Sequence, residues 1–218
     1  MRLPFKPRGI LFDLDGVLLD SMGYHFTAWE RVFREMGIRV DRLEIYLREG
    51  EKGLVTARSI MEERGRVPSE EEVSQLLARK EGIFKEIARA KLFPEAEELV
   101  DSLWRRNYPL GLVTGTSRGE VEKILPQGLQ KRFRVIVTGD IISKGKPHPE
   151  PYLVALQYLG LSPEGVLVIE NAPYGIRSAK GAGLFCIGLT TTLGEEYLKE
   201  ADMVFNSLGD AVKILLGD

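Results

Sequence analysis

Two aspartates separated by one residue follow the first apolar run of the chain, in the segment GILFDLDGVLLDS at residues 9–21. The apolar run predicts a short strand, and because side chains alternate along a strand, Asp13 and Asp15 should point the same way. Adjacent carboxylates repel each other, and a hard cation such as Mg²⁺ compensates them. Gly16 has no Cβ and lets backbone N–H groups approach an anion. The segment predicts either a site for Mg²⁺ and phosphate or an ordinary strand end.

A segment rich in hydroxyl groups follows a second apolar run. Residues 108–114 (YPLGLVT) predict a buried strand, and Thr114, Gly115, Thr116 and Ser117 stand at its end. Hydroxyl groups, a glycine and the first N–H groups of a helix form a typical receptor for phosphate. The same residues would also serve as a simple helix cap.

Two further strand ends carry charged or amide groups. Lys146 stands between a glycine and a proline after the predicted strand at 135–138, where it could neutralise a phosphate or a nucleophile. Glu170 and Asn171 follow the predicted strand at 166–169, and their oxygens suit a hard cation. Each motif alone could be a turn or a solvated strand end. Together they predict one site, because ligands bind at the carboxyl ends of parallel strands.

Strands and helices alternate from about residue 92 onwards. The predicted strands lie at 108–114, 135–138, 166–169, 184–189 and 203–205. Predicted helices begin near residues 94 and 117 and lie at 149–159, 173–182 and 208–216. In the helix near 94, Trp104 is expected to face inward with its apolar neighbours. This alternation predicts an α/β fold with a doubly wound parallel sheet and right-handed crossovers.

A charged helical insert interrupts this pattern after the first strand. Apolar stripes at helical spacing predict helices at 25–36, 54–61 and 73–87, and a polar, glycine-containing stretch predicts a loop at 43–53. Ser69 and Glu72 form a capping box that starts the third of these helices. We therefore predict an α/β core at 1–19 and 92–218 and an all-helical cap at 20–91.

Composition narrows the possible partners and locations. The 218 residues are 44% hydrophobic, carry a net charge of −2 and mix acidic with basic residues, so we expect neither a nucleic acid nor a membrane as partner. The single cysteine, Cys186, excludes a disulfide framework and favours a reducing, cytoplasmic location. The first residues reach the aspartates before any long apolar segment, so we expect no signal peptide. We expect a monomer or a weak homo-oligomer.

The motifs together resemble the haloacid dehalogenase-like hydrolase superfamily. The likeness covers FDLDGVLLDS, LVTGTS, GKPHPEPY and VIENAPYGIRSAKGAG, and it includes a helical cap inserted after the first motif. The resemblance implies a Rossmann-like core and a hydrolase of small phosphorylated metabolites. Dehalogenases of the superfamily lack the second aspartate, so Asp15 argues against that reaction. The insert contains no recognisable lysine of the phosphonate-cleaving type.

The resemblance also implies a role for each motif residue. Asp13 would attack phosphorus to give an aspartyl-phosphate, and Asp15 would act as general acid and then as general base. Thr114 would hold phosphoryl oxygens, with Gly16, Gly115 and Thr116 beside it, and Lys146 would offset negative charge.

Magnesium is the cofactor that the resemblance implies. Its ligands would be the carboxylate of Asp13, the backbone carbonyl of Asp15 and a group from Glu170 or Asn171. The family usually has an aspartate at the position of Asn171, so the ligand set here departs from the pattern.

Substrate contacts are expected from the cap. The stretch around His25 resembles the start of the cap in β-phosphoglucomutases, where the histidine helps to position the general acid, but a buried structural histidine fits the same pattern. Arg48 and Lys52 are candidates for substrate contacts, or else belong to a solvated loop. The order of Arg48 and the following glycines matches the mutases poorly, so a phosphatase is favoured over a sugar-phosphate mutase. A non-catalytic phosphate-binding module, suggested only by Asn171, is the third alternative.

Overall fold

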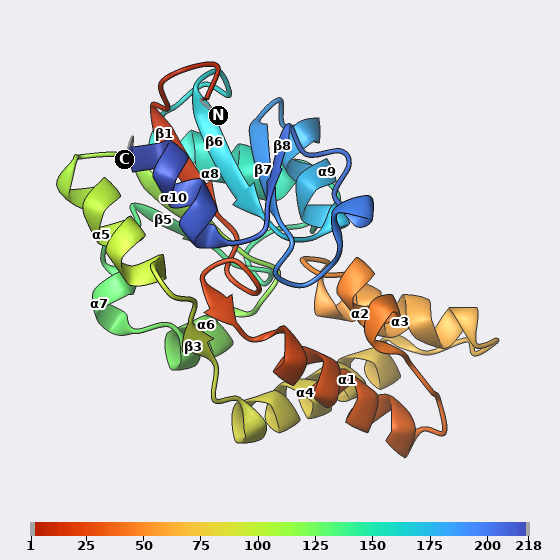
Figure 1. Cartoon of the computed structure of the whole chain (residues 1–218). Helices are drawn as coiled ribbons and strands as arrows, with labels where there is room; N and C mark the ends of the chain where they lie inside the picture. The colour runs from red at the N-terminus through yellow and green to blue at the C-terminus, as the bar shows by residue number, and fades with distance from the viewer. Residues whose placement is uncertain (1–2, 217–218) are drawn as a thin grey trace.

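The computed structural model describes residues 3–216 and shows a sheet between two helical layers, with a group of helices beyond the lower edge of the sheet (Figure 1). The predicted core also includes residues 1, 2, 217 and 218, which lie outside the described residues. No helix within residues 3–216 has the length and apolar character needed to span a membrane.

Six parallel strands form the main sheet in the order β5-β4-β1-β6-β7-β8. The strands are β1 (Gly9–Phe12), β4 (Leu110–Val113), β5 (Val135–Val137), β6 (Val166–Glu170), β7 (Phe185–Leu189) and β8 (Met203–Phe205). In the centre, Leu11 of β1 pairs with Gly111 of β4 and Val168 of β6. The strand order reverses at β1, so the carboxyl end of β1 is the expected place for a ligand. The predicted doubly wound parallel sheet is confirmed.

Helices cover both faces of this sheet. They are α5 (Ala96–Arg105), α6 (Arg118–Ile124), α7 (Gln127–Gln130) and α10 (Leu208–Leu216) on one face, α8 (Glu150–Leu159) and α9 (Pro173–Gly181) on the other, and the short 3₁₀ helix η1 (Glu195–Tyr197) after β7. Side chains alternate along β1, so Ile10 and Phe12 pack in the first layer and Leu11 in the second. The expected inward position of Trp104 is wrong. Its side chain is 43% exposed and lies under the Arg132 guanidinium, 4.2 Å from the ring centre.

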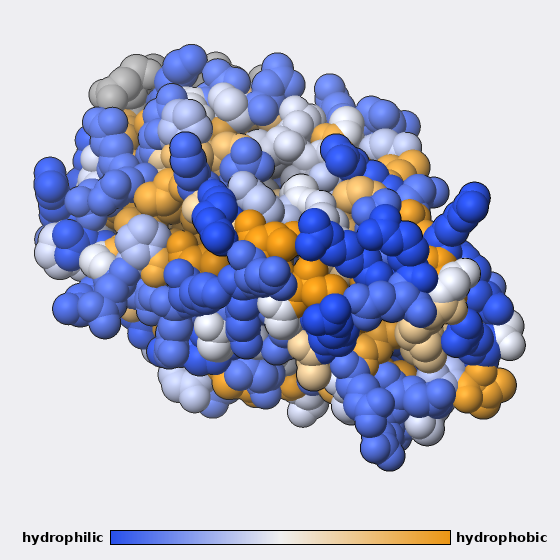
Figure 2. Space-filling view, turned by 90° about the horizontal axis from the view of Figure 1, so that it is seen from below, coloured by the Kyte–Doolittle hydropathy of each residue, from blue (hydrophilic) through white to orange (hydrophobic). Residues whose placement is uncertain are grey.

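Four helices form a second packed unit. They are α1 (Met22–Glu35), α2 (Arg42–Leu47), α3 (Gly53–Glu63) and α4 (Glu70–Ile87). Their buried side chains, such as Phe33, Ile60 and Phe84, form a hydrophobic cluster separate from those of the sheet. The outer surface seen from this side is largely hydrophilic, with smaller apolar areas between charged side chains (Figure 2).

The start of α4 confirms one local prediction, and α2 corrects another. The Ser69 hydroxyl accepts from the Glu72 N–H, and the Glu72 carboxylate accepts from the Ser69 N–H, which is the predicted capping box. The predicted loop at 43–53 is partly wrong, because α2 occupies its first residues. The Asp41 carboxylate caps α2 by accepting from the Glu44 N–H at 2.8 Å, and Ile45 is buried. These two interactions stabilise a helix of only six residues.

A pair of short antiparallel strands connects the two units. These are β2 (Leu19–Asp20) and β3 (Lys91–Leu92), which pair at the points where the chain leaves the core and returns to it. The predicted boundaries at 19/20 and 91/92 fall inside this pair. We propose that residues 20–91 are the cap and that the rest of the chain is the core.

Candidate active site

Asp13 stands directly after β1 and shares a buried lysine with Glu170. The Lys146 ammonium donates to Asp13 Oδ1 and to Glu170 Oε1, both at 2.6 Å, and to the backbone carbonyl of Val113 at 3.0 Å. The Tyr152 hydroxyl also donates to Glu170 Oε1, at 2.6 Å. The strand ends of β1, β4 and β6 and the loop after β5 thus meet at one point, as expected for a parallel sheet.

The charges at this point do not balance. One ammonium faces two buried carboxylates, and burial raises the pKa of Asp13 to about 8, with Glu170 and Asp15 adding to the effect and Lys146 opposing it. For Lys146, burial disfavours the charged form, but Asp13 and Glu170 outweigh it and raise the pKa of the ammonium above its usual value. Lys146 is therefore a cation, and the group still lacks positive charge.

Asp15 has a different environment, with donors around both of its oxygens. Oδ1 accepts from the Ser21 hydroxyl at 2.5 Å and contacts His25 Nε2 at 3.0 Å, while Oδ2 accepts from the hydroxyls of Thr116 at 2.7 Å and Thr114 at 3.3 Å. Burial acts to raise the pKa of Asp15. The adjacent His25 and the hydrogen bonds from His25, Ser21 and Thr116 outweigh burial, and the pKa lies well below its usual range.

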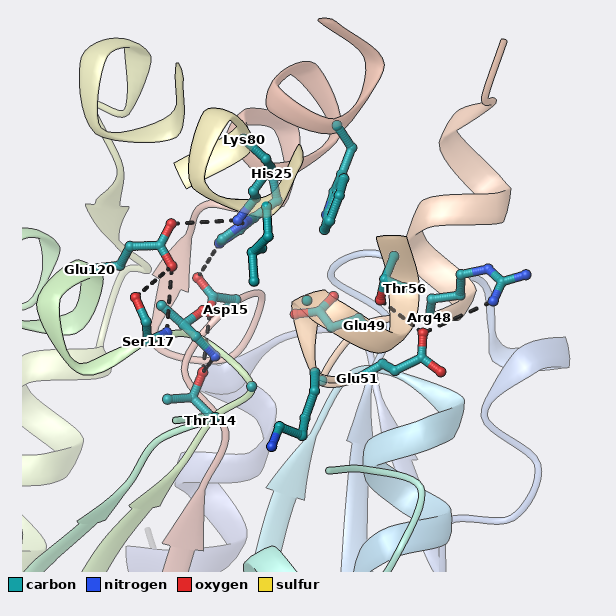
Figure 3. A pocket seen from close by; sticks show the side chains of 18 of the residues that line it. Asp15, His25, Arg48, Glu49, Glu51, Thr56, Lys80, Thr114, Ser117 and Glu120 are labelled. Atoms are coloured by element: carbon teal, nitrogen blue, oxygen red, sulfur yellow. Dashed lines mark hydrogen bonds and ion pairs between the residues drawn. The ribbon is translucent and has the colours of Figure 1, made fainter. Parts of the chain in front are cut away.

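His25 is held by a lysine that the sequence analysis did not identify. The Lys80 ammonium lies 3.1 Å from His25 Nδ1 and 3.5 Å from Glu120 Oε1, and the His25 ring stacks on Phe84 at 4.1 Å (Figure 3). An ammonium can only donate, so His25 accepts at Nδ1 and donates from Nε2 to Asp15. Lys80 lies on the apolar face of α4, four residues before Phe84. The signal available in the sequence was a lysine at an apolar position of the helical pattern, between Leu76 and Phe84.

Asp13 and Asn171 each have one side-chain oxygen without a hydrogen-bond partner. Asp13 Oδ2 and Asn171 Oδ1 are both buried without a partner, whereas both Glu170 oxygens are used: Lys146 and Tyr152 donate to Oε1, and the Asn171 N–H donates to Oε2 at 3.1 Å. Unsatisfied buried oxygens are costly and suit a hard cation. The residues present therefore fit Mg²⁺, and they favour Asn171 over Glu170 as its direct ligand.

The fit depends on one carboxylate oxygen, from Asp13, and one amide oxygen, from Asn171. Within residues 3–216 there is no cluster of three or more His, Cys, Asp or Glu side chains arranged to hold a metal. Gly16 adopts φ = 84° beside this site, and a Cβ at this position would collide with the Asn171 amide. The predicted glycine is thus required both by the turn and by the close approach of Asn171.

A loop of the cap lies against the core site. A Cβ on Gly115 would lie 2.7 Å from the carbonyl oxygen of Gly50, and a Cβ on Gly50 would lie 2.5 Å from Lys146 Cδ. A cavity of about 340 Å³ remains between the two units, lined by both aspartates and by cap residues. The cap is therefore closed over the strand ends.

The predicted substrate contacts Arg48 and Lys52 line this cavity but have partners elsewhere. Arg48 pairs with Glu63 at 2.5 Å and faces Glu51 at 4.0 Å. The Lys52 ammonium donates to the carbonyl of Ile142 at 2.8 Å. Both side chains hold the cap loop in place in this closed structure.

Comparison with known proteins agrees with this geometry. The family model of the haloacid dehalogenase-like hydrolases matches residues 7–183. The chain belongs to this family. Validoxylamine A 7′-phosphate phosphatase from Streptomyces hygroscopicus subsp. limoneus is 35% identical over 91% of this chain and 92% of that protein. Hexitol phosphatase A from Escherichia coli is 30% identical over 92% and 91%.

Solved structures of the haloacid dehalogenase-like family share the same arrangement. β-Phosphoglucomutase from Clostridium difficile is 25% identical, covers 94% of this chain and 92% of its own, and has a TM-score of 0.83. The predicted family, its Rossmann-like fold and the enzyme class, a phosphoric monoester hydrolase, are confirmed.

Proposed function

We propose that this chain is a Mg²⁺-dependent phosphatase that hydrolyses a small phosphorylated metabolite through an aspartyl-phosphate on Asp13. The observation that carries the proposal is the meeting of Asp13, Asp15, Thr114 and Lys146 in one closed site. Asp13 has a free oxygen there, Asp15 lies beside the hydroxyl groups, and Lys146 supplies positive charge.

In the first step, an Asp13 carboxylate oxygen forms a bond to phosphorus while the bond from phosphorus to the leaving oxygen breaks. Asp15 donates a proton to that leaving oxygen and then takes a proton from the water that hydrolyses the acyl-phosphate. Thr114 and Thr116 donate to Asp15 in this structure. Turning these hydroxyls to the phosphoryl oxygens would remove stabilisation from the Asp15 carboxylate and favour its protonated form.

Mg²⁺ would be held by Asp13 Oδ2, Asn171 Oδ1 and the backbone carbonyl of Asp15. When bound, the cation supplies the positive charge that the buried carboxylates lack and offsets charge on the transferred phosphoryl group. Lys146 keeps Asp13 oriented through its 2.6 Å contact and shares this role. The closed cap excludes bulk water from the acyl-phosphate.

A small leaving group fits the cavity of about 340 Å³. Both curated relatives described above are named as phosphatases of small molecules, which supports a metabolite substrate. We place the activity in the cytoplasm on the basis of Cys186, which is free and buried.

A sugar phosphomutase is the second candidate, because a solved β-phosphoglucomutase shares the fold and His25 contacts Asp15. A mutase must also bind the second phosphate of a bisphosphate. Arg48 and Lys52 are the predicted cap cations for that task, but each has partners within the protein. This engagement favours hydrolysis.

The test is phosphate release from a panel of sugar, polyol, nucleotide and acid phosphates, with Mg²⁺ and with EDTA. We expect turnover of at least one class with Mg²⁺ and none with EDTA, and Asp13→Asn should reduce turnover to background while the protein stays folded by circular dichroism. Undiminished turnover by Asp13→Asn would refute the proposal. Priming of phosphate transfer between sugar positions by a sugar bisphosphate would identify the mutase instead.

A further inference from the structure

Glu49 is a buried carboxylate of the cap that reaches the core site. It follows α2 in the cap loop, and only 8% of its surface is exposed. Its Oε2 accepts from Asn171 Nδ2 at 3.2 Å, while its Oε1 is buried without a hydrogen-bond partner. In Figure 3 the Glu49 side chain points toward the side of the pocket that holds Asp15, and Glu51 from the same loop points the other way, toward Thr56 and Arg48.

The unsatisfied oxygens of the site therefore come from both units. Asp13 Oδ2 and Asn171 Oδ1 belong to the core, and Glu49 Oε1 belongs to the cap. A chain of hydrogen bonds connects the three residues, because Lys146 joins Asp13 to Glu170, Glu170 accepts from the Asn171 N–H, and the Asn171 amide donates to Glu49. Three hard oxygens without donors, on residues that these hydrogen bonds connect, are a suitable ligand set for a divalent cation.

The side-chain amide of Asn171 is complementary to the carboxylate of Glu49, because it donates a hydrogen bond to it. Asn171 Nδ2 donates to Glu49 Oε2 and to Thr192 Oγ1, which uses both of its hydrogens and leaves Oδ1 free as an acceptor. An aspartate at position 171 would instead place a second carboxylate against Glu49 and repel it. The carboxyl group that position 171 lacks is thus present on the cap, at Glu49.

We propose that Glu49 is a cation ligand supplied by the cap, so that one divalent cation joins Asp13 and Asn171 of the core to Glu49 and binds most tightly when the cap is closed. This inference rests on the proposed cation dependence and extends it to the position of the cap. Because linkage is reciprocal, a cation that prefers the closed form also shifts the cap toward closure.

The first experiment measures Mn²⁺ affinity by electron paramagnetic resonance for the full chain. We expect Glu49→Gln to weaken binding at least about tenfold. Glu51→Gln is the matched control, because Glu51 lies in the same loop but pairs with Thr56 at 2.8 Å, and its affinity should stay within about twofold of wild type. Glu49→Ala provides a second variant, and circular dichroism verifies the fold of each.

Returning the charge to the core gives a sharper version of this experiment. Asn171→Asp combined with Glu49→Gln restores a carboxylate to the site without a ligand from the cap. We expect this double variant to regain most of the Mn²⁺ affinity lost in Glu49→Gln, but to lose the link between the cation and the cap.

The second experiment follows the cap itself by distance measurement between spin labels. Val67→Cys on the cap and Tyr158→Cys on the core provide positions that are 98% and 72% exposed, and the native Cys186 is buried. Mn²⁺ is replaced here by the diamagnetic Mg²⁺. Mg²⁺ should narrow the distance distribution in wild type and Glu51→Gln and leave it unchanged in Glu49→Gln and in the double variant.

The outcomes separate this inference from the proposed function. Equal Mn²⁺ affinity of wild type and Glu49→Gln, with wild type binding the cation, would overturn the role of Glu49 alone. If Mg²⁺ did not change the distance between the spin labels in wild type, the proposed coupling between cation binding and cap closure would be overturned. Absence of Mn²⁺ binding to wild type would instead refute the cation dependence in the proposed function, and this inference with it.

Discussion

Asp13 and Asp15 stand two residues apart at the end of β1 and are both buried, yet their hydrogen-bond partners and neighbouring charges differ. Both oxygens of Asp15 accept hydrogen bonds, and its pKa is lowered. Asp13 has one oxygen on Lys146 and one without a partner, and its pKa is raised to about 8. Protein donors alone stabilise the Asp15 carboxylate, whereas Asp13 requires further positive charge from outside the protein.

The cap has opposite effects on the surroundings of the two aspartates, which we call the Asp15 side and the Asp13 side of the site. Ser21 and His25, at the start of the cap, add donors to Asp15, while Glu49 adds another carboxyl group near Asp13. Burial and the nearby Asp13, Asp15 and Glu170 raise the pKa of Glu49 well above its usual value. Closure of the cap therefore completes the hydrogen bonds on the Asp15 side and increases the demand for a cation on the Asp13 side.

Asp15→Asn is expected to have the largest effect on turnover while leaving the Asp13 side of the site unchanged. The amide cannot transfer the proton, and loss of general acid–base catalysis lowers kcat about 10²–10⁴-fold. The Asp15 backbone carbonyl and the Asp13 side are retained, so Mn²⁺ affinity should be unchanged. Steady-state kinetics and Mn²⁺ titration of the same preparation test this, and a parallel loss of cation affinity would contradict the separation of the two sides.

Lys146→Met should disrupt the Asp13 side without altering the Asp15 side. It leaves Asp13 and Glu170 buried without their ammonium, and breaking a buried ion pair in this way costs about 3–5 kcal/mol in the free energy of unfolding. Urea denaturation in EDTA measures the loss. Lys144→Met, at an exposed position two residues earlier, should change stability by less than about 0.5 kcal/mol. Equal stability of the two variants would show that Lys146 is not essential to this group of charges.

Lys80→Met tests the support behind Asp15. Without Lys80, His25 Nδ1 loses its donor and the orientation of the ring toward Asp15 is less well defined. A hydrogen bond to a charged group contributes about 1.5–3 kcal/mol, so we expect kcat to fall about 10–100-fold. As Lys80 acts through His25, the kcat–pH profile should also shift, which a purely structural role would not cause. Lys85→Met, on the more exposed part of the same helix, should leave both unchanged, and an unshifted profile in Lys80→Met would argue against a positioning role.

The sheet and its strand ends could be predicted because their signals are local. Apolar runs such as that before Asp13 end in glycine and polar residues, and parallel topology then brings the ends together. The short α2 was missed because six residues are too few to show a clear helical period, and the helix depends on the Asp41 cap and on burial of Ile45. The two-residue strands β2 and β3 exist only through their mutual pairing, which no local pattern encodes.

The same distinction applies to the site. The residues of the core motifs could be predicted, since each stands at the end of a recognisable strand. The position of Lys80 on an apolar helix face was a signal of burial, but the partners of Lys80 and Glu49 could not be predicted, because they depend on where the cap lies relative to the core. Lys80 contacts His25, which lies 55 positions away in the chain, and Glu49 contacts Asn171, which lies 122 positions away. Residues around Glu49 were instead expected to contact substrate or solvent.

Gly115→Ala should give the smallest effect and test whether closure affects the two sides unequally. The new Cβ would lie 2.7 Å from the Gly50 carbonyl oxygen, so the cap loop must shift or the cap must open slightly. Glu49 precedes Gly50 and would move with it, while His25 lies on α1 and would keep its contact with Asp15. At the lower end of the cost of overpacking, about 1 kcal/mol, we expect Mn²⁺ affinity to fall about fivefold.

Gly119→Ala is the matched control for this change, because a Cβ at that position would meet nothing within 4 Å apart from its chain neighbours and the nearby backbone of its own helix, α6. Its Mn²⁺ affinity should equal that of wild type. If Gly115→Ala instead lowered kcat without altering Mn²⁺ affinity, the cap loop would act on the Asp15 side, and the asymmetry between the two aspartates would not extend to the cap.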